Sequence, residues 1–336
     1  MSSDNLAALG WDDDFAEQVT AEDAGTVPVR VTAVHRARIE VLGEAGTLDL
    51  IPASNLSTSN VAVGDWLMAR EGVALRVLDR RSLVARKAAG SGVARQLIAA
   101  NLDSLLVVSS CNADFNLGRM ERFLVLAASA GVEPVVVLTK ADTAVDPEAY
   151  VAEARSLKRG LPVVLLDAKR GDVRGALAQW CKAGQTVALL GSSGVGKTTI
   201  ANALTGGAAA VQDVRDDDAK GRHTTTGRYL VAMAEGGWLI DTPGMREVQL
   251  TDAGEGIGLL FDDLTALALT CKFRNCKHEG EPGCAIQAAI VAGDVEPARL
   301  ARWKKLMGED GANSATLQLS QQRAGAARKG PGKWKR

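Results

Sequence analysis

Residues 191–198 have the sequence Gly-Ser-Ser-Gly-Val-Gly-Lys-Thr, which fits the phosphate-loop pattern G-x-x-x-x-G-K-[ST]. Glycines at these positions let backbone N–H groups curl around a chain of phosphates, and the start of the following helix adds a favourable field for the anion. We expect Lys197 to reach the β- and γ-phosphates of a nucleotide and Thr198 to offer its hydroxyl to Mg²⁺. The residues predicted to contact the nucleotide here are Gly191, Ser192, Ser193, Gly194, Val195, Gly196, Lys197, Thr198 and Thr199.

A second motif, Thr-Lys-Ala-Asp at 139–142, indicates which base the nucleotide carries. It follows an apolar run that predicts a strand, and open α/β sheets bind ligands at the carboxyl ends of their strands. A carboxylate at Asp142 can accept both the ring N–H and the exocyclic NH₂ of guanine, which adenine does not offer as a pair. We therefore predict guanine recognition by Thr139, Lys140, Ala141 and Asp142, with the Lys140 stem covering the base. The alternative is a surface turn, and Thr139 stands where this motif usually has Asn.

Two later segments could sense the γ-phosphate. Asp-Thr-Pro-Gly at 241–244 follows another apolar run, so Asp241 should act on Mg²⁺ through water and the Gly244 N–H should contact the γ-phosphate. Residues 221–226, Gly-Arg-His-Thr-Thr-Thr, lie between this element and the phosphate loop. A Thr from this segment, for which we choose Thr225, would complete the Mg²⁺ shell, as switch segments do. Alone, the segment would indicate only a solvated Thr-rich loop.

The chain lacks the usual group for positioning the attacking water. Many GTPases carry a Gln directly after D-x-x-G, whereas this chain has Met245. Since phosphoryl transfer depends on positioning and charge neutralisation, we predict low intrinsic turnover. His223 is the candidate for the catalytic role, because an imidazole can order water near neutral pH. The alternative is that His223 only contacts RNA or solvent.

Three thiols and one imidazole fall within fourteen residues late in the chain: Cys271, Cys276, His278 and Cys284. Soft sulfur and nitrogen donors in a set of four match a structural Zn²⁺ with no position left open for catalysis. Three cysteines cannot form two disulfides, and the cytosol is reducing. We predict one structural zinc here, and we expect the other two cysteines, Cys111 and Cys181, to be core residues.

The spacing of apolar residues predicts the elements that position these motifs. Residues 27–78 contain five short β patterns, which favour a small barrel such as an OB-fold, although a β module without a ligand fits equally. From residue 104 to 204, apolar strands alternate with amphipathic helices, the pattern of a parallel sheet covered on both faces. A hairpin at 229–240 adds to that sheet, and the pattern turns helical from about residue 252.

The order of the motifs is itself informative. A conventional GTPase runs phosphate loop, switch I, switch II and guanine motif, whereas here the guanine motif comes first and switch II last. The cyclic order is kept and only the cut point has moved. Together with the late cysteines, this arrangement resembles the RsgA (YjeQ) family of circularly permuted GTPases over residues 27–310. The resemblance includes Asn-Leu-Asp at 101–103, Asp-Phe-Asn at 114–116 and the Gly-Arg-His-Thr-Thr-Thr segment.

The resemblance implies an architecture, an activity and partners. It implies hydrolysis of GTP to GDP, stimulated by the small (30S) ribosomal subunit during late assembly, with contacts to 16S rRNA and a role for His223. It also implies that the backbone N–H of Ala168 meets guanine O6, although this chain has Asp-Ala-Lys where the family often has Ser-Ala. The resemblance implies an OB-fold, a permuted α/β GTPase domain and a mostly helical zinc-binding domain, which we place at 27–80, 101–250 and 251–310. Charge and composition add an acidic disordered tail at 1–26, a basic linker at 81–100 and a basic tail at 311–336.

Composition sets the remaining limits. With 46% hydrophobic residues a sizeable core is possible, yet no run approaches the ~20 apolar residues that span a bilayer. We expect a cytoplasmic monomer with no membrane partner. Residues 1–26 hold seven acids and no base, and 311–336 hold six bases and no acid. Such tails are usually disordered, and the basic one would contact nucleic acid or merely solubilise. The alternatives to a GTPase cycle are an RNA-binding scaffold that uses GTP structurally and an unrelated ATP-dependent enzyme.

Overall fold

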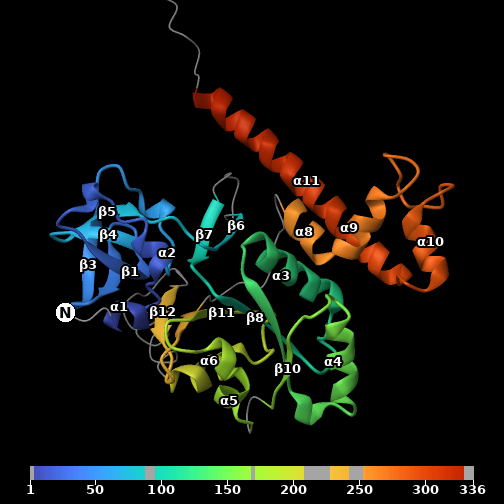
Figure 1. Cartoon of the computed structure of the whole chain (residues 1–336), viewed down its shortest axis with the longest axis horizontal. Helices are drawn as coiled ribbons and strands as arrows, with labels where there is room; N and C mark the ends of the chain where they lie inside the picture. Colours follow the sequence, from blue (N-terminus) through green and yellow to red (C-terminus); the bar gives the residue numbers. More distant parts are fainter. Residues whose placement is uncertain (1–3, 88–94, 168–170, 208–227, 242–252, 329–336) are drawn as a thin grey trace, which may run out of the picture.

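The computed structural model describes residues 4–87, 95–167, 171–207, 228–241 and 253–328, with the backbone alone for 4, 86, 87, 95, 241, 313 and 315–328. Figure 1 shows a β-barrel at the N-terminal end, a central sheet flanked by helices, and C-terminal helices of which α11 projects away from the body. Among the described helices, none combines the length and apolarity needed to cross a bilayer.

The N-terminal barrel is closed by five strands in the order β1-β2-β3-β5-β4. Alternate residues of these strands point inward, so that Val29, Val31, Ile39, Val41 and Leu67 form the barrel core. This confirms the predicted five-stranded barrel. The strands are β1 (Val27–Val34), β2 (Ile39–Gly43), β3 (Gly46–Pro52), β4 (Trp66–Arg70) and β5 (Val73–Val77).

The central sheet has six strands in the order β10-β9-β8-β11-β13-β12, parallel except for β12, which pairs antiparallel with β13. The strands are β8 (Ser104–Ser110), β9 (Glu133–Thr139), β10 (Val163–Leu165), β11 (Thr186–Leu190), β12 (Tyr229–Ala232) and β13 (Trp238–Asp241). The central strands β8 and β11 are buried along their whole length, which explains their unbroken apolar runs.

Helices cover both faces of this sheet. Because side chains alternate along a strand, Leu105 and Val107 of β8 face one layer, whereas Leu106 and Val108 face the other. The first layer contains α3 (Leu117–Ser129) and α4 (Pro147–Arg155), and the second contains α5 and α6. The second-layer helices are α5 (Val173–Leu177), which continues as a 3₁₀ turn, η4 (Ala178–Trp180), and α6 (Lys197–Thr205).

The C-terminal helices share the first of these cores. They are α8 (Gly254–Leu260), α9 (Asp262–Leu269), α10 (Ala285–Ala292) and α11 (Pro297–Arg328). Helix α8 lies directly on α3, where a side chain at Gly256 would come within 2.6 Å of the Val125 carbonyl oxygen. Ile257, Phe261 and Ile286 join the same hydrophobic cluster as α3. The C-terminal region therefore packs as an extension of the sheet domain and does not form a core of its own.

The prediction of a disordered tail at 1–26 is wrong for residues 4–26. This segment forms α1 (Asp4–Ala8), α2 (Asp13–Ala16) and the 3₁₀ helix η1 (Ala21–Asp23), and Phe15 within it is fully buried. Its seven acids favour disorder, but its apolar residues are buried and make the segment fold. Leu9 and Phe15 are buried beside Trp66, Met68 and Leu78 of the barrel region.

The predicted linker and basic tail also differ from the structure. Strands β6 (Leu83–Lys87) and β7 (Arg95–Ala100) form an antiparallel pair within 81–100, and the Gly-Ser-rich run at 88–92 lies outside the described residues. Beyond residue 310, the backbone of α11 continues to Arg328. Ala, Leu, Gln and Arg dominate this stretch and favour helix, which explains why the chain stays helical there.

Two ion pairs fasten α11 to α3. Arg302 donates from Nε to Oε1 of Glu121 at 2.6 Å, and the Glu121 side chain is 0% exposed. Arg122 and Glu309 pair at 2.7 Å in a more exposed position. Burial raises the pKa of Glu121, and the Arg302 guanidinium opposes that rise. Of the two pairs between α11 and α3, the one at Glu121 therefore holds a buried charge that depends on Arg302 for its direct ion pair.

We expect Arg302→Met to lower the free energy of unfolding by about 3–5 kcal/mol, because it leaves the Glu121 carboxylate buried without its partner. Arg122→Met is the matched control, since a partly exposed pair contributes about 1 kcal/mol or less. Urea denaturation followed by circular dichroism measures both. Equal losses in the two variants would contradict a dominant role for the buried pair.

The deficit in the free energy of unfolding of Arg302→Met, relative to the wild type, should also depend on pH. Loss of the opposite charge raises the pKa of Glu121 further above its ordinary value. A carboxyl whose pKa is higher in the folded state stabilises the fold below its unfolded pKa, and this contribution is lost as pH rises through the folded pKa. The deficit should therefore shrink as pH falls towards about 4 and widen above it. A deficit that does not change with pH would indicate lost packing instead.

Candidate functional site

The phosphate loop lies at the carboxyl end of the central strand β11, directly before α6. Its first residue, Gly191, passes so close to β8 that a side chain there would collide with the Val108 carbonyl oxygen. Its last, Gly196, takes φ +101° immediately before α6 begins at Lys197. Backbone N–H groups at the start of this helix are free of helical partners and can bind an anion. The strand, loop and helix predicted for residues 186–204 are confirmed.

The Lys197 side chain folds back over the loop. Its Nζ donates to the Gly191 carbonyl oxygen at 2.7 Å and to the Ser192 carbonyl oxygen at 2.6 Å. The ammonium is therefore held at the loop that would receive the phosphates. Thr198, the predicted Mg²⁺ ligand, is exposed at the first turn of α6, where a hydroxyl is open to a cation.

The guanine motif is tied to the phosphate loop by Thr139. This residue ends β9 and is 1% exposed. Its Oγ1 lies 2.6 Å from the Val195 carbonyl oxygen in the phosphate loop and 3.1 Å from the Ser109 carbonyl oxygen on β8. A threonine hydroxyl can donate one hydrogen bond, and the shorter contact is to Val195. The departure from Asn at this position thus leaves a direct link between the two motifs.

Lys140 and Asp142 follow this anchor on the surface. Lys140 takes the left-handed conformation, with φ +57°, and begins the 3₁₀ turn η3 (Ala141–Thr143). Asp142 lies in that turn and is exposed, so its carboxylate is open to a ligand. The anchor is buried and the proposed reader is accessible, which is the arrangement a base-binding loop requires.

We expect Thr139→Val to weaken GTP binding about fivefold to thirtyfold, because the Val195 carbonyl loses a buried donor worth about 1–2 kcal/mol. Thr139→Ser keeps the hydroxyl and should bind GTP nearly as the wild type does. Thr143→Val is a second control, since that hydroxyl bonds only the Lys140 carbonyl at the surface. Titration with a fluorescent GTP analogue measures all three. Normal affinity in Thr139→Val would show that the link does not shape the site.

Switch II begins at the same edge of the sheet. Strand β13 is parallel to β11, with Ala188 opposite Ile240, so Asp241 follows on the side of the phosphate loop. Only the backbone of Asp241 is described. The other residues predicted for the nucleotide site, Ala168, His223, Thr225 and Gly244, lie outside the described residues, as does Met245. Their roles stay predictions.

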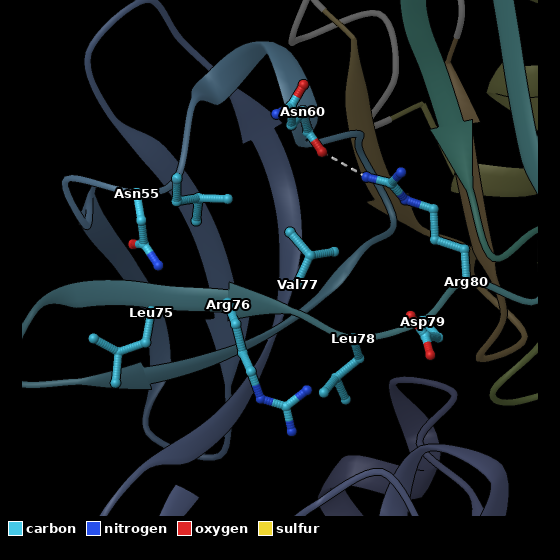
Figure 2. A pocket seen from close by; sticks show the side chains of 9 residues that line it. Asn55, Asn60, Leu75, Arg76, Val77, Leu78, Asp79 and Arg80 are labelled. Atoms are coloured by element: carbon cyan, nitrogen blue, oxygen red, sulfur yellow. Dashed lines mark hydrogen bonds between the residues drawn. The ribbon is translucent and has the colours of Figure 1, made fainter. Parts of the chain in front are cut away.

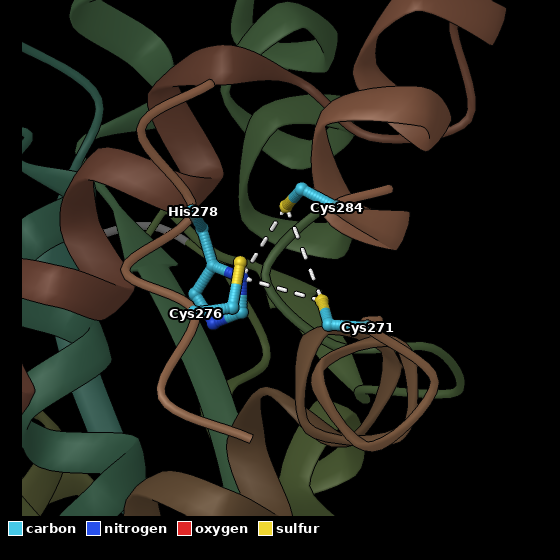
Figure 3. Close-up of side chains that lie close together, drawn as sticks. All are labelled: Cys271, Cys276, His278 and Cys284. Carbon is cyan, nitrogen blue, oxygen red and sulfur yellow. Dashed lines mark hydrogen bonds between the residues drawn. The ribbon is translucent and has the colours of Figure 1, made fainter. Parts of the chain in front are cut away.

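The four predicted metal ligands converge in the C-terminal region (Figure 3). The donor atoms of Cys271, Cys276, His278 and Cys284 all lie within 4.8 Å of one another. His278 Nδ1 is 3.4 Å from Cys284 Sγ and 3.6 Å from Cys271 Sγ, and these two sulfurs are 4.0 Å apart. A tetrahedral ion with Zn–S near 2.3 Å and Zn–N near 2.0–2.1 Å places sulfurs about 3.8 Å apart and S···N about 3.6 Å apart. The cluster therefore fits zinc.

Neighbouring groups hold the ligand loop in shape. Gln287 Nε2 donates to the His278 carbonyl oxygen at 2.8 Å, which supports the left-handed backbone there, with φ +58°. The Glu281 carboxylate accepts the N–H groups of Lys277 at 2.6 Å and Glu279 at 2.8 Å. Burial, with a smaller effect of Lys304, lowers the pKa of His278 and keeps the ring neutral, the form that binds metal. The sequence pattern predicted the four ligands but not the supporting role of Glu281.

The two remaining cysteines behave differently. Cys111 and Cys181 are buried apart from the cluster, as predicted. Burial raises the pKa of each thiol to about 11, so both stay protonated and apolar in character. They belong to the hydrophobic cores on opposite faces of the sheet.

One hollow on the barrel was not foreseen from the sequence (Figure 2). It has a volume of about 400 Å³ and lies between the 3₁₀ turn η2 (Thr58–Asn60) and β5. Both arginines on its wall are already engaged. Arg76 pairs with Asp23 at 2.6 Å, and Arg80 pairs with Asp65 at 2.7 Å. We assign the hollow no role in the nucleotide site.

Comparison with known proteins agrees with this geometry. The family model described as RsgA GTPase matches residues 77–251. The chain is 51% identical over 319 residues to a small ribosomal subunit biogenesis GTPase RsgA of Mesorhizobium japonicum, covering 93% of this chain and 92% of that one. The chain belongs to the RsgA GTPase family. It is also 46% identical over 326 residues to an RsgA 2 protein of Vibrio parahaemolyticus, covering 96% and 90% of the two chains.

Two solved structures share the fold of this RsgA family member. YjeQ from Thermotoga maritima superposes with a TM-score of 0.63 at 24% identity, over 84% of this chain and 98% of that one. YloQ, described as a circularly permuted GTPase, gives a TM-score of 0.63 at 22% identity, over 87% and 97%. The barrel, the permuted GTPase sheet and the helical region with its cysteine cluster thus form the architecture that the resemblance to the RsgA family implied.

Proposed function

We propose that this RsgA family member binds the small (30S) ribosomal subunit and hydrolyses GTP in coupling to its late assembly. The observation that carries the proposal is the contact between Thr139 and Val195, which joins a guanine motif to a phosphate loop that follows it in the sequence. The two relatives named above are both small ribosomal subunit biogenesis GTPases, which supports the choice of pathway. In this proposal the protein acts in the cytoplasm as a monomer and contacts 16S rRNA.

The nucleotide would be held by the phosphate loop and the guanine motif. Mg²⁺ would bind to the Thr198 hydroxyl, to a switch I threonine, Thr225, and through water to Asp241. The ion would neutralise charge on the β- and γ-phosphates when bound. Gly244 and Ala168 would contact the γ-phosphate and guanine through backbone N–H groups. His223 would position the attacking water, since Met245 can neither accept nor donate strongly.

The cysteine cluster would hold one structural Zn²⁺. With four protein ligands, no position stays open for substrate, so the metal supplies rigidity to the loop between α9 and α10. In the sequence, the proposed switch II at 241–244 precedes α8 of this region. Ala253, just before α8, donates its N–H to the Asp310 carboxylate of α11 at 2.9 Å. Loss of the γ-phosphate could thereby alter how the C-terminal helices meet RNA.

GTP turnover measured with and without purified 30S subunits tests the proposal. We expect slow turnover by the protein alone and marked stimulation by the subunits. A scaffold that used GTP only as a structural ligand would show no stimulation. Competition with unlabelled ATP should leave bound GTP in place, and displacement by ATP would contradict the guanine assignment. His223→Ala should lose the stimulated rate, and wild-type turnover by this variant would remove His223 from catalysis.

A further inference from the structure

Residues 4–26 cross from the barrel to the central sheet, and we call this segment the strap. On the barrel side it inserts Trp11 and Phe15 against Trp66 of β4. The ring centroids of Trp11 and Trp66 are 4.9 Å apart and nearly perpendicular, and those of Phe15 and Trp66 are 5.9 Å apart. Phe15 and Trp66 are both fully buried. The strap therefore completes an aromatic cluster that the barrel alone would leave exposed.

Ion pairs fix the middle and the end of the strap to the barrel and to the residues that follow it. Asp23 accepts two hydrogen bonds from the Arg76 guanidinium, at 2.9 and 2.6 Å. Asp12 pairs with Arg81 at 2.6 Å, and the same guanidinium lies 4.6 Å from the Phe15 ring centroid. These ion pairs hold residues 12–23 on the barrel and on the residues that directly follow it.

The first part of the strap is bonded to the central sheet instead. Trp238, the first residue of β13, donates from Nε1 to the Ala8 carbonyl oxygen at 2.8 Å. Gly10 lies so close to the turn before β11 that a side chain on it would be 2.6 Å from the Gly184 carbonyl oxygen. From the other side, a side chain on Gly184 would be 2.8 Å from the Ala7 carbonyl oxygen. Backbone meets backbone here with no room for side chains.

Arg30 connects all three parts. It belongs to barrel strand β1 and is 2% exposed. One of its terminal nitrogens donates to the Leu9 carbonyl oxygen of the strap, and the other donates to Thr186 Oγ1 at 2.7 Å. Thr186 is the first residue of β11 and is itself fully buried. A buried guanidinium bonded to two other segments is stable only while those segments stay in place.

The strands reached by the strap are those that carry the nucleotide loops. Strand β11 runs from Thr186 to the phosphate loop, and β13 runs from Trp238 to Asp241 of switch II. The barrel also touches β13 directly, since a side chain on Gly64 would lie 3.0 Å from Cδ1 of Ile240. The strap, the barrel and strands β11 and β13 thus form one continuous contact.

We propose that the strap locks the barrel to the strands that lead into the phosphate loop and switch II, so that the barrel and the nucleotide site move as one body. Domains joined within a chain move relative to one another unless their interface is large and apolar. The strap provides the apolar cluster and the buried Arg30 bonds that oppose such motion. A displacement of the barrel, such as one caused by docking to a large partner, would then also displace the nucleotide loops.

The chain offers a matched pair of glycines to test this. Gly10 and Gly25 both lie in the strap with positive φ, +90° and +77°. An added methyl group strains the backbone at both positions, but only at Gly10 does it meet the central sheet, because nothing lies within 4 Å at Gly25. Gly10→Ala therefore opposes the lock, and Gly25→Ala controls for backbone strain. Gly184→Ala opposes the same contact from the sheet side.

Hydrogen exchange followed by mass spectrometry is the first readout. We expect the amides of residues 4–16 and 229–241 to exchange about tenfold faster, or more, in Gly10→Ala and Gly184→Ala, and at the wild-type rate in Gly25→Ala. Small-angle scattering of the same variants should show a larger radius of gyration only for the first two. Unchanged exchange in both Gly10→Ala and Gly184→Ala would overturn the lock. None of these measurements requires the ribosome.

The second readout rests on the proposed function. Gly10→Ala should keep the GTP affinity and basal turnover of the wild type but lose most of the stimulation by 30S subunits. If the wild type itself shows no stimulation, the proposed function fails, while the exchange data still decide whether the lock exists. If Gly10→Ala instead binds single-stranded RNA more tightly than the wild type, the strap covers an RNA surface and the lock is overturned.

Discussion

A Lys197→Ala variant should bind GTP about a hundredfold more weakly, or worse, and should hydrolyse it at a negligible rate. Loss of one partner from a desolvated charge pair costs about 2–5 kcal/mol, and a hundredfold change in affinity corresponds to about 2.7 kcal/mol. The variant also removes the two hydrogen bonds from Nζ to the carbonyl oxygens of Gly191 and Ser192. The phosphate loop then loses both the positive charge of Lys197 and the hydrogen bonds that stabilise its conformation.

Calorimetric titration with GTP and with GDP separates these two effects. GDP lacks the γ-phosphate, so its affinity should fall less than that of GTP if Lys197 reaches both the β- and γ-phosphates. Lys182→Ala is the control, since this exposed lysine stands in the turn before β11 and should change either affinity less than about twofold. Wild-type GTP affinity in Lys197→Ala would mean that residues 191–198 are not the phosphate site.

The central sheet could be predicted closely because burial on both faces leaves a simple signal. The sequence predicted apolar strands that alternate with helices from residue 104 to 204, and β8 (Ser104–Ser110) and β11 (Thr186–Leu190) are two such strands. Residues 105–108 of β8 and 187–190 of β11 are unbroken apolar runs, and few other structures explain such runs. The end of α5 at Leu177, where the chain continues as a 3₁₀ turn, has no comparable signal in the sequence.

The strap could not be predicted because its local charge favours disorder, whereas its packing against residues distant in the sequence favours a folded segment. Its seven acids indicate disorder when the segment is considered alone. The apolar residues that fold it, among them Leu9 and Phe15, find their partners only once Trp66 and Trp238 come together. Those partners are some 50 and 220 residues further along the chain. No local pattern carries such information.

The site shows the same limit. Motif spacing predicted the phosphate loop, the guanine motif and the metal ligands, because the chemistry fixes those residue types. The bond from Thr139 to Val195 depends instead on the strand order β9-β8-β11, which places the two loops at one edge. The substitution of Asn by Thr looked like a weakness in the sequence. In the structure the shorter side chain still reaches the loop, because the residue is buried against it.

Removal of the metal should have a second large effect, the local unfolding of the structure around the cysteine cluster. This unfolding should be confined to the C-terminal region. We expect Cys284→Ser to lose stoichiometric zinc and to melt α10 and the adjoining loop, because apparent zinc-binding free energies of about 10–16 kcal/mol serve as folding energy in small sites. Cys284 caps the N-terminus of α10 and is buried in the core on the α3 face, which also contains Ile286. The phosphate-loop helix α6 packs in the core on the other face. GTP affinity should therefore change little.

Metal analysis together with hydrogen exchange over residues 271–292 measures this directly. Cys181→Ser is the matched control, because it removes a buried thiol by the same substitution outside the cluster and should keep full zinc. Acidification should release the metal, since protons compete for the thiolates and for the imidazole of His278. Full zinc content in Cys284→Ser would exclude this ligand set. Loss of zinc with unchanged exchange would mean that packing on α3 alone holds the C-terminal helices, and that the metal is dispensable for the fold.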